Sequence, residues 1–291
     1  MSGLKAIRRR LGSVKNTKQI TRAMKLVSAA KLRRAQDAAI FSRSFSDDLL
    51  KVLKAVLGQL PDNFSSPLIV PRAVVKRRRI IVIAGDRGLC GPYNTNVLRA
   101  AHQEITNSAV ETEVVCMGRR AVSAAKRFGW KTVAEYESLP EDANQWPVSE
   151  IFKKAVNDYS AEKIDEVVLF YTKFVTAMTQ RVTREVVLPV TIDSLSLTAE
   201  QTKTPTLPAT FSPQAAELMT SLLPLALEMR FRLAGLESKA SEHAARMSAM
   251  DSATRNADDL MGKLRLFYNR ARQSSITKEL LDIIGGAEAL K

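Results

Sequence analysis

The feature that most constrains the fold of this chain lies near its C-terminus, in the stretch SEHAARMSAMDSATRNADDL at residues 241–260. The stretch holds charges of both signs, many alanines and no glycine or proline that would break a helix. Around it, small or apolar residues alternate at spacings of four and three: Leu236, Ala240, His243, Met247, Met250, Thr254, Ala257, Met261, Leu264, Tyr268 and Ala271. This spacing is a heptad seam, which predicts a long helix with one narrow face turned toward a partner helix.

A second long helix is expected at the other end of the chain. Small or apolar residues recur there every three or four positions: Leu4, Ile7, Leu11, Val14, Thr17, Ile20, Met24, Val27, Ala30, and further on Leu49, Val52 and Val56. Gly58 and the prolines that follow it end this pattern. Two narrow seams at opposite ends of one chain bury each other most simply as an antiparallel two-helix coiled coil.

These seams are rich in alanine, threonine and methionine, where a self-sufficient coiled coil has leucine and isoleucine. Burial contributes about 25 cal/mol per Å², and alanine has little area to bury. We therefore expect the coiled coil to need support from outside the chain. A weak but free-standing coiled coil is the alternative.

The middle of the chain has the pattern of an α/β domain. Strands are expected at 80–84, which has the pattern of a buried strand, and at 113–118, 166–175 and 180–190. Helices are expected between the first three of these strands, and Gly129 closes one of them. Alternating strands and helices predict a Rossmann-like, doubly wound parallel sheet. The predicted domains are an N-terminal helix at 1–60, the α/β domain at 72–195, and a C-terminal helix at 212–291 that starts at Ser212 and Pro213 and runs nearly to Gly285 and Gly286.

The glycine loop after the first strand is the one place that suggests an enzyme. Its spacing, G-x-x-G-x-x-G from Gly85 to Gly91, matches neither the dinucleotide nor the P-loop pattern, so we interpret it as a structural turn. The two histidines, His102 and His243, have no neighbouring metal ligands at a useful spacing. The sequence therefore predicts no catalytic residue, metal or cofactor, and a nucleotide-using enzyme on the sheet is a weaker hypothesis.

The charge of the chain points to acidic partners. Lys and Arg number 44 against 30 Asp and Glu, a formal net charge of +14. The run KRRR at 76–79 precedes a buried strand and is interpreted as a solvated edge or a protein contact. A basic coiled-coil protein that binds nucleic acid is the alternative function, although the sequence has no interleaved aromatics or helix-turn-helix pattern to support it.

Two further properties bear on the compartment. Cys90 and Cys116 lie in apolar surroundings, which favours buried free thiols. No apolar run reaches the roughly 18 residues that a membrane span needs. The basic N-terminal stretch has the composition of a mitochondrial transit peptide, but its helical pattern continues past residue 36, so we interpret it as part of the mature protein.

Three stretches resemble one family, the gamma subunit of F-type ATP synthases. They are IRRRLGSVKNTKQITRAMKLVSAAKLRRAQ near the N-terminus, GDRGLCGPYNTN after the first strand, and SEHAARMSAMDSATRNADDL with LFYNRARQSSITKELLDIIGGAEAL at the C-terminus. The order and length agree over nearly the whole chain, whereas 105–211 agrees in layout more than in letters. Pro92 stands where the family commonly has a second glycine, and the cysteine-bearing regulatory insert of chloroplast relatives is absent.

The resemblance implies a non-catalytic rotary subunit. In that family the two long helices form the central shaft inside a ring of three alpha and three beta subunits, and the sheet domain sits with the epsilon subunit on the membrane c-ring. It implies no bound nucleic acid and no direct nucleotide binding. It also implies a peripheral protein on the cytoplasmic side of a bacterial inner membrane, and a polar exterior of the coiled coil that suits a turning shaft.

The resemblance also implies roles for individual residues. Met24, Arg246, Gln273 and Thr277 match the positions through which the shaft engages the beta-subunit levers and the surrounding catch loops. The planar guanidinium of Arg246 could hold a carboxylate of an acidic lever, and the basic N-terminal helix would face the same levers. An apolar tip that acts as a pivot matches Ile283, Ile284, Ala287 and Leu290.

Overall fold

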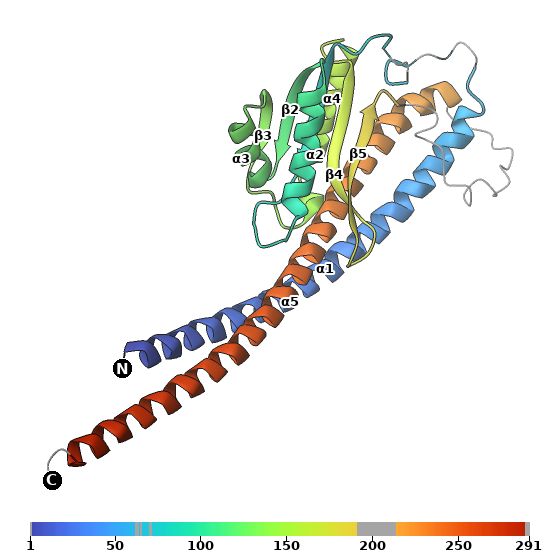
Figure 1. Ribbon diagram of the computed structural model, residues 1–291. Helices are drawn as coiled ribbons and strands as arrows, with labels where there is room; N and C mark the ends of the chain where they lie inside the picture. The colour runs from blue at the N-terminus through green and yellow to red at the C-terminus, as the bar shows by residue number, and fades with distance from the viewer. Residues whose placement is uncertain (1, 62–63, 65, 70–71, 191–213, 289–291) are drawn as a thin grey trace. The chain divides into compact units, whose positions relative to one another are not determined.

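The computed structural model describes residues 2–61, 64, 66–69, 72–190 and 214–288 (Figure 1). The chain divides into two compact units. The terminal unit contains Met1–Ala29 and Arg246–Lys291, and the sheet unit contains Ala30–Ala245. Two long helices, α1 (Ser2–Leu57) and α5 (Ala215–Glu288), each contribute residues to both units.

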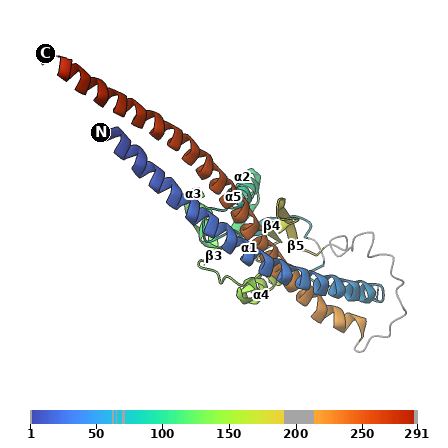
Figure 2. The same cartoon turned by 90° about the horizontal axis from the view of Figure 1, so that it is seen from below.

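In the terminal unit, α1 and α5 run side by side in opposite directions (Figures 1 and 2). The Nζ atom of Lys18 lies 2.6 Å from Oδ1 of Asp258, and that of Lys25 lies 2.5 Å from Oδ1 of Asp251. Seven residues forward along α1 thus correspond to seven residues back along α5. This register is that of an antiparallel heptad pair, which confirms the predicted coiled coil.

The seam of α5 follows the predicted heptad positions. From Met247 to Ala271 every predicted seam residue is buried or half-buried, whereas most residues between them are exposed. Met250, Ala257 and Met261 are 4%, 7% and 7% exposed. The strict alternation of four and three therefore identified the buried face of α5 correctly.

The predicted stripe on α1 is only partly correct. Its first four positions, from Leu4 to Val14, are half-buried, but Thr17, Ile20, Val27 and Ala30 are exposed. The buried positions are instead Thr21 and Ser28. Repeated steps of three residues rotate a stripe around a helix, and only the alternation of three and four keeps it on one face. The buried heptad positions in this part of α1 are polar, so a search for apolar residues could not identify them.

The sheet unit contains one five-stranded sheet in the order β3-β2-β1-β4-β5. The strands are β1 (Arg77–Ile83), β2 (Glu111–Met117), β3 (Thr132–Tyr136), β4 (Glu166–Phe174) and β5 (Gln180–Leu188). β1 to β4 are parallel, but β5 pairs antiparallel with β4, so the sheet is mixed and not wholly parallel as predicted. A short connection between β4 and β5 allows only a hairpin, since a parallel pair needs a longer crossover. The sequence prediction also missed β3.

Helices cover both faces of the sheet, which confirms the doubly wound architecture (Figure 1). One face packs against α2 (Tyr93–Asn107) and α3 (Arg119–Phe128) through Ile80 and Val82 of β1. The other packs against α4 (Val148–Ser160) and the parts of α1 and α5 in this unit through Ile81 and Ile83. A three-residue helix, η1 (Ala143–Gln145), precedes α4. The alternation of buried side chains along β1 thus separates two apolar cores.

The ends of the elements differ in part from the prediction. Gly129 ends α3 in the left-handed conformation, with φ +68°, as its sequence position predicted. α5 contains Pro224 and continues through Gly285 and Gly286 to Glu288, so the glycine pair does not end it. The predicted helix start at Ser212 and Pro213 lies outside the described residues.

Candidate functional site

The glycine loop at 85–91 connects β1 to α2 at the carboxyl end of β1. β1 lies between β2 and β4, where the strand order reverses. In doubly wound sheets the crevice at this reversal is the usual ligand site. A nucleotide bound to this sheet would therefore lie against the loop.

Residues of α5 occupy the carboxyl end of the sheet. A Cβ atom at Gly85 would lie 3.2 Å from Cδ of the Glu242 side chain. On β4, the backbone N–H of Thr172 donates to Oγ of Ser238 at 3.3 Å, and Oγ of Ser241 donates to the Thr172 carbonyl at 3.0 Å. Both serines are fully buried. A helix thus stands beside the loop, and its side chains fill the space that a phosphate approaching Gly85 would need, so the geometry opposes nucleotide binding there. The Glu242 carboxylate itself pairs with Lys239 at 3.3 Å.

Gly118 shows that the loops at this end of the sheet are closely packed. It precedes α3 with φ +96°, and a Cβ atom there would lie 2.1 Å from the carbonyl oxygen of Ala84. Only glycine permits this approach. Gly118 therefore serves the close packing of these loops.

The basic run at 76–79 is only partly the solvated edge that the sequence predicted, since Lys76 and Arg77 are exposed, whereas Arg78 is half-buried and Arg79 is buried. Arg77, Arg78 and Arg79 lie inside β1. Arg78 pairs with Glu166 and, at 2.8 Å, with Glu104. Because two of these arginines are neutralised within the fold, the run offers little to a nucleic acid.

Arg79 is the more deeply buried of the two. It is 6% exposed and pairs with Asp158 at 2.7 Å and Glu113 at 3.1 Å. Burial alone would raise the pKa of Asp158, but hydrogen bonding and charge from Arg79 outweigh it and hold that pKa below its usual value. The sequence signal for this outcome was the adjacent strand, since the true end of a strand can lie a few residues from its predicted end.

The histidines and cysteines have structural surroundings. His102 stacks on Phe128 with ring centroids 4.1 Å apart and lies 3.3 Å from the indole nitrogen of Trp130. His243 is buried, with Nε2 2.9 Å from a carboxylate oxygen of Glu141. Within the described ranges, no three His, Cys, Asp or Glu side chains are grouped so as to hold a metal ion.

The two cysteines are buried free thiols, as predicted. Burial raises the pKa of the Cys116 thiol to about 12, and the nearby charge of Glu135 adds to this effect. A thiol with so high a pKa is protonated at neutral pH and is not a nucleophile. The surroundings of Cys116 therefore suit packing and not catalysis.

The residues with predicted lever contacts lie in the terminal unit. Met24 is half-buried on α1, and Arg246 on α5 is 8% exposed. Gln273 and Thr277 are exposed one turn apart on α5, where Oγ1 of Thr277 donates to the Gln273 carbonyl at 3.0 Å. The structure thus places Gln273 and Thr277 together on an accessible face, and it leaves little of the Arg246 side chain accessible.

The predicted apolar tip is partly described. Ile283 and Ile284 are 68% and 59% exposed. Leu290 lies outside the described residues, as does the side chain of Ala287. The tip therefore presents at least two large apolar side chains to solvent.

The outside of the terminal unit is less polar than the sequence suggested. Large apolar side chains are exposed on both helices at Ile20, Leu26, Val27, Leu266, Phe267, Ile276, Leu280 and Leu281. Single apolar residues on a surface are ordinary, but a series along two paired helices marks a contact surface. Sequence reasoning missed these residues, and the available signal was that most of them fall outside the strict heptad positions.

None of the described helices has a stretch long and apolar enough to cross a membrane. Comparison with known proteins relates the whole chain to one family. A family model described as ATP synthase matches residues 3–290. Proteins named ATP synthase gamma chain from Pelotomaculum thermopropionicum and Heliobacterium modesticaldum are each 40% identical to this chain, and each alignment covers 100% of both proteins.

Solved structures show the same fold at lower identity. A chain from the Euglena gracilis mitochondrial ATP synthase rotor is 19% identical, with a TM-score of 0.64 over 94% of this chain and 99% of that one. Another from the same organism's ATP synthase is 20% identical, with a TM-score of 0.68 over 99% and 95%.

Proposed function

The chain belongs to the ATP synthase gamma-chain family, and from this premise we propose that it turns as the central shaft of the complex. In this role it couples ion flow through the membrane sector to ATP synthesis or hydrolysis at an alpha–beta hexamer. The chain itself is non-catalytic. The crowded carboxyl end of its sheet, where Glu242 stands beside Gly85, agrees with this assignment.

The observation that carries the proposal is the antiparallel pairing of the two chain ends. Lys18 with Asp258 and Lys25 with Asp251 fix the register of α1 against α5 in the terminal unit. Two different helices wound together make an asymmetric object, which presents a different side to each of several similar sites around it. Each site then favours a different conformation, and turning the object shifts the populations in sequence.

The partners follow from the same role. We propose that three alpha and three beta subunits surround the terminal unit, and that the sheet unit contacts the epsilon subunit and the membrane c-ring. The chain would then be peripheral to a bacterial inner membrane, on its cytoplasmic side. The net charge of +14 supports contacts with acidic surfaces of these partners.

The proposed contact residues differ in exposure. Gln273 and Thr277 are exposed and are proposed to meet the beta-subunit catch loops. Met24 and Arg246 are proposed to engage the levers. Because Arg246 is buried, its side chain would also hold the neighbouring side chains in place. Ile283, Ile284 and Leu290 are proposed as the pivot, supported by the exposure of the first two.

Reconstitution tests the function. The purified chain is mixed with an alpha–beta hexamer, and the assembly is joined to membrane vesicles that contain the ion-translocating sector. We expect the chain to co-elute with the hexamer, and ATP synthesis driven by an ion gradient to require it. Equal synthesis in vesicles that lack the chain would contradict the proposal.

Arg246→Ala tests the proposed lever contact. We expect lower ATP synthesis from an assembled complex, because a guanidinium that binds a carboxylate bidentately has no substitute in alanine. Arg265→Ala is the matched control, since Arg265 is exposed on the same helix. Unchanged synthesis in Arg246→Ala, with normal amounts of complex, would refute the role.

A further inference from the structure

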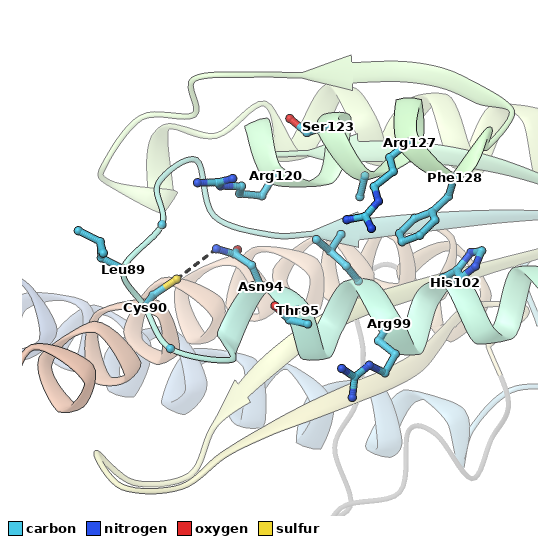
Figure 3. Close-up of a pocket in the computed structure, with 14 residues that line it drawn as sticks. Leu89, Cys90, Asn94, Thr95, Arg99, His102, Arg120, Ser123, Arg127 and Phe128 are labelled. Carbon is cyan, nitrogen blue, oxygen red and sulfur yellow. Dashed lines mark hydrogen bonds between the residues drawn. The ribbon is translucent and has the colours of Figure 1, made fainter. Parts of the chain in front are cut away.

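A groove of about 530 Å³ lies between α2 and α3 on one face of the sheet (Figure 3). The loop at 88–91 lines one end of it, and His102 and Phe128 line the other. All residues that line the groove belong to the sheet unit, whereas the residues assigned to lever contacts belong to the terminal unit. Its composition suggests a use that the shaft function does not explain.

Three arginines line this groove: Arg99 from α2, with Arg120 and Arg127 from α3. No aspartate or glutamate is among the fourteen residues that line it. In the part of the chain that the structure describes, none of these arginines makes an ion pair, whereas Arg78 and Arg79 each pair with two carboxylates. The groove thus has a concentrated positive charge that the fold does not neutralise.

The groove also has an apolar floor. Leu98 and Ala124 line it between the arginines, and Phe128 is 39% exposed at one end. The Phe128 ring already stacks on His102, and the guanidinium carbon of Arg127 lies 5.6 Å from its centroid. A ring engaged in this way is poorly available for stacking with a nucleic-acid base, so the groove suits an amphipathic acidic ligand better than a nucleic acid.

The spacing of the arginines sets the spacing of the ligand's charges. Arg120 and Arg127 are two helical turns apart on α3, and therefore separated by roughly 10 Å along its axis. Figure 3 shows Arg120 near the loop and Arg127 reaching from α3 toward α2. Both are exposed, as Arg99 is, so the charges line an open rim and do not enclose a small ion.

We propose that this groove binds an acidic amphipathic helix of a partner subunit. Carboxylates two turns apart on that helix pair with Arg120 and Arg127, and its apolar side chains lie on Leu98 and Phe128. Charge complementarity and the groove between two helices both favour this occupant. The inference rests on the proposed function, because the assembled complex supplies the partner.

Photo-crosslinking in the assembled complex tests the inference. Thr95, an exposed residue that lines the groove, is replaced by p-benzoylphenylalanine in the full chain. The complex is purified and irradiated, and the crosslinked segment is identified by mass spectrometry. We expect a crosslink to a partner segment with two carboxylates about two helical turns apart.

Two charge-reversal variants measure whether the arginines recruit that segment. The variant Arg120→Glu with Arg127→Glu should lower the crosslink yield at least tenfold. The control Lys153→Glu with Lys154→Glu makes the same change in net charge at exposed residues of α4, which covers the other face of the sheet, and should lower the yield less than twofold.

The outcomes separate this inference from the proposed function. A complex that assembles and synthesises ATP, yet crosslinks only to a segment without carboxylates, to this chain itself, or to co-purified nucleic acid or lipid, overturns the groove assignment and leaves the shaft function intact. Equal losses in the two charge-reversal variants also overturn it, since the attraction would then be general. Failure of the unsubstituted chain to join a hexamer contradicts the shaft function instead.

Discussion

The terminal unit and the sheet unit bury side chains of different kinds. The sheet unit has a core of branched and aromatic residues, and Ile80, Val82 and Val168 in it are fully buried. The seam of the terminal unit contains Thr21, Ser28 and other small or polar residues. Stabilisation scales with the apolar area removed from water. The sheet unit is therefore stabilised by its own core, whereas the terminal unit gains much less from its own seam. Two parts of the same helix can therefore differ in how much their stability depends on a partner subunit.

The ion pairs of the two units differ in the same sense. Lys18 and Asp258 of the terminal unit have side chains 30% and 61% exposed, whereas Arg79 and Asp158 of the sheet unit have side chains 7% and 15% exposed. Exposed pairs are worth little, and buried pairs cost much when one partner is removed. The pairs in the terminal unit set its register, and those in the sheet unit are part of its core.

The largest difference between the two units is expected in the free energy of unfolding lost when a glycine is replaced. Gly118→Ala in the sheet unit would place a Cβ atom 2.1 Å from the Ala84 carbonyl oxygen, at a φ of +96°. We expect a loss of more than about 4 kcal/mol in the free energy of unfolding, or no soluble protein. Gly12→Ala in the terminal unit meets nothing within 4 Å and should be neutral or stabilising by up to about 1 kcal/mol. Equal losses, measured by chemical denaturation, would contradict this contrast.

The second-largest loss of stability is expected at an ion pair that joins α1 to α5 inside the sheet unit. Nη2 of Arg43 lies 2.5 Å from Oε1 of Glu237. The Glu237 side chain is 2% exposed, and burial raises its pKa although Arg43 opposes the shift. Arg43→Ala leaves this carboxylate buried without its arginine, and should cost about 3 kcal/mol at neutral pH.

The pH dependence of that loss has a definite sign. Since the folded-state pKa of Glu237 lies above its ordinary value, protonation relieves the buried charge, and the loss in Arg43→Ala should shrink as the pH falls through that raised pKa. Arg43→Ala combined with Glu237→Gln should recover most of the stability. A loss independent of pH, or a double variant as unstable as the single one, would show that the charge is not the cause.

Hydrogen exchange in the isolated chain should show a smaller difference in stability between the terminal unit and the sheet unit. We expect amides at 4–28 to exchange roughly a hundredfold faster than those of β1, which corresponds to about 2.7 kcal/mol in opening free energy. Melting followed by circular dichroism should begin at low temperature, or the chain should aggregate. A single sharp helical transition at high temperature, with uniform protection, would show that the coiled coil needs no partner.

The smallest effect is expected at the ion pair of the terminal unit. The hydrogen bond from Lys25 is the main reason that the pKa of Asp251 lies below its usual value, and the charge of Arg255 adds to it. This pair therefore contributes stability above the ordinary aspartate pKa of about 4 and loses it as the pH falls through the lowered value. Lys25→Met should change the melting temperature only slightly, and should move the acid unfolding midpoint upward. A large loss at neutral pH would place this pair among the stabilising contacts of the core.

The sequence predicted those parts of the fold that repeat a simple period. The heptad of α5 could be followed because Met250, Ala257 and Met261 keep strict spacing. The seam of α1 could not, because at Thr21 and Ser28 it passes through polar residues, while apolar Ile20 and Val27 lie outside it. Strand β3 was missed because its five residues are only half-buried or exposed, which leaves no apolar run to detect.

The surroundings of the candidate sites could not be predicted from the sequence, because tertiary contacts determine them. No local pattern indicates that Glu242 stands beside Gly85, since the two residues come from distant parts of the chain. The carboxylates that neutralise Arg78 and Arg79 come from α2, α4 and two neighbouring strands, and a run of basic letters does not reveal them. Neither the exposure of Gln273 and Thr277 nor the burial of Arg246 could be obtained from a motif.

The exposed apolar residues of the terminal unit also bear on how cells manage this protein. Leu266, Phe267 and Ile283 are each at least 60% exposed in the chain by itself. A newly made copy without its partners presents these side chains to chaperones and proteases, which select for such surfaces. Supply of the partners would then set how many copies survive, and the side chains that we propose face the neighbours would also keep subunit numbers in proportion.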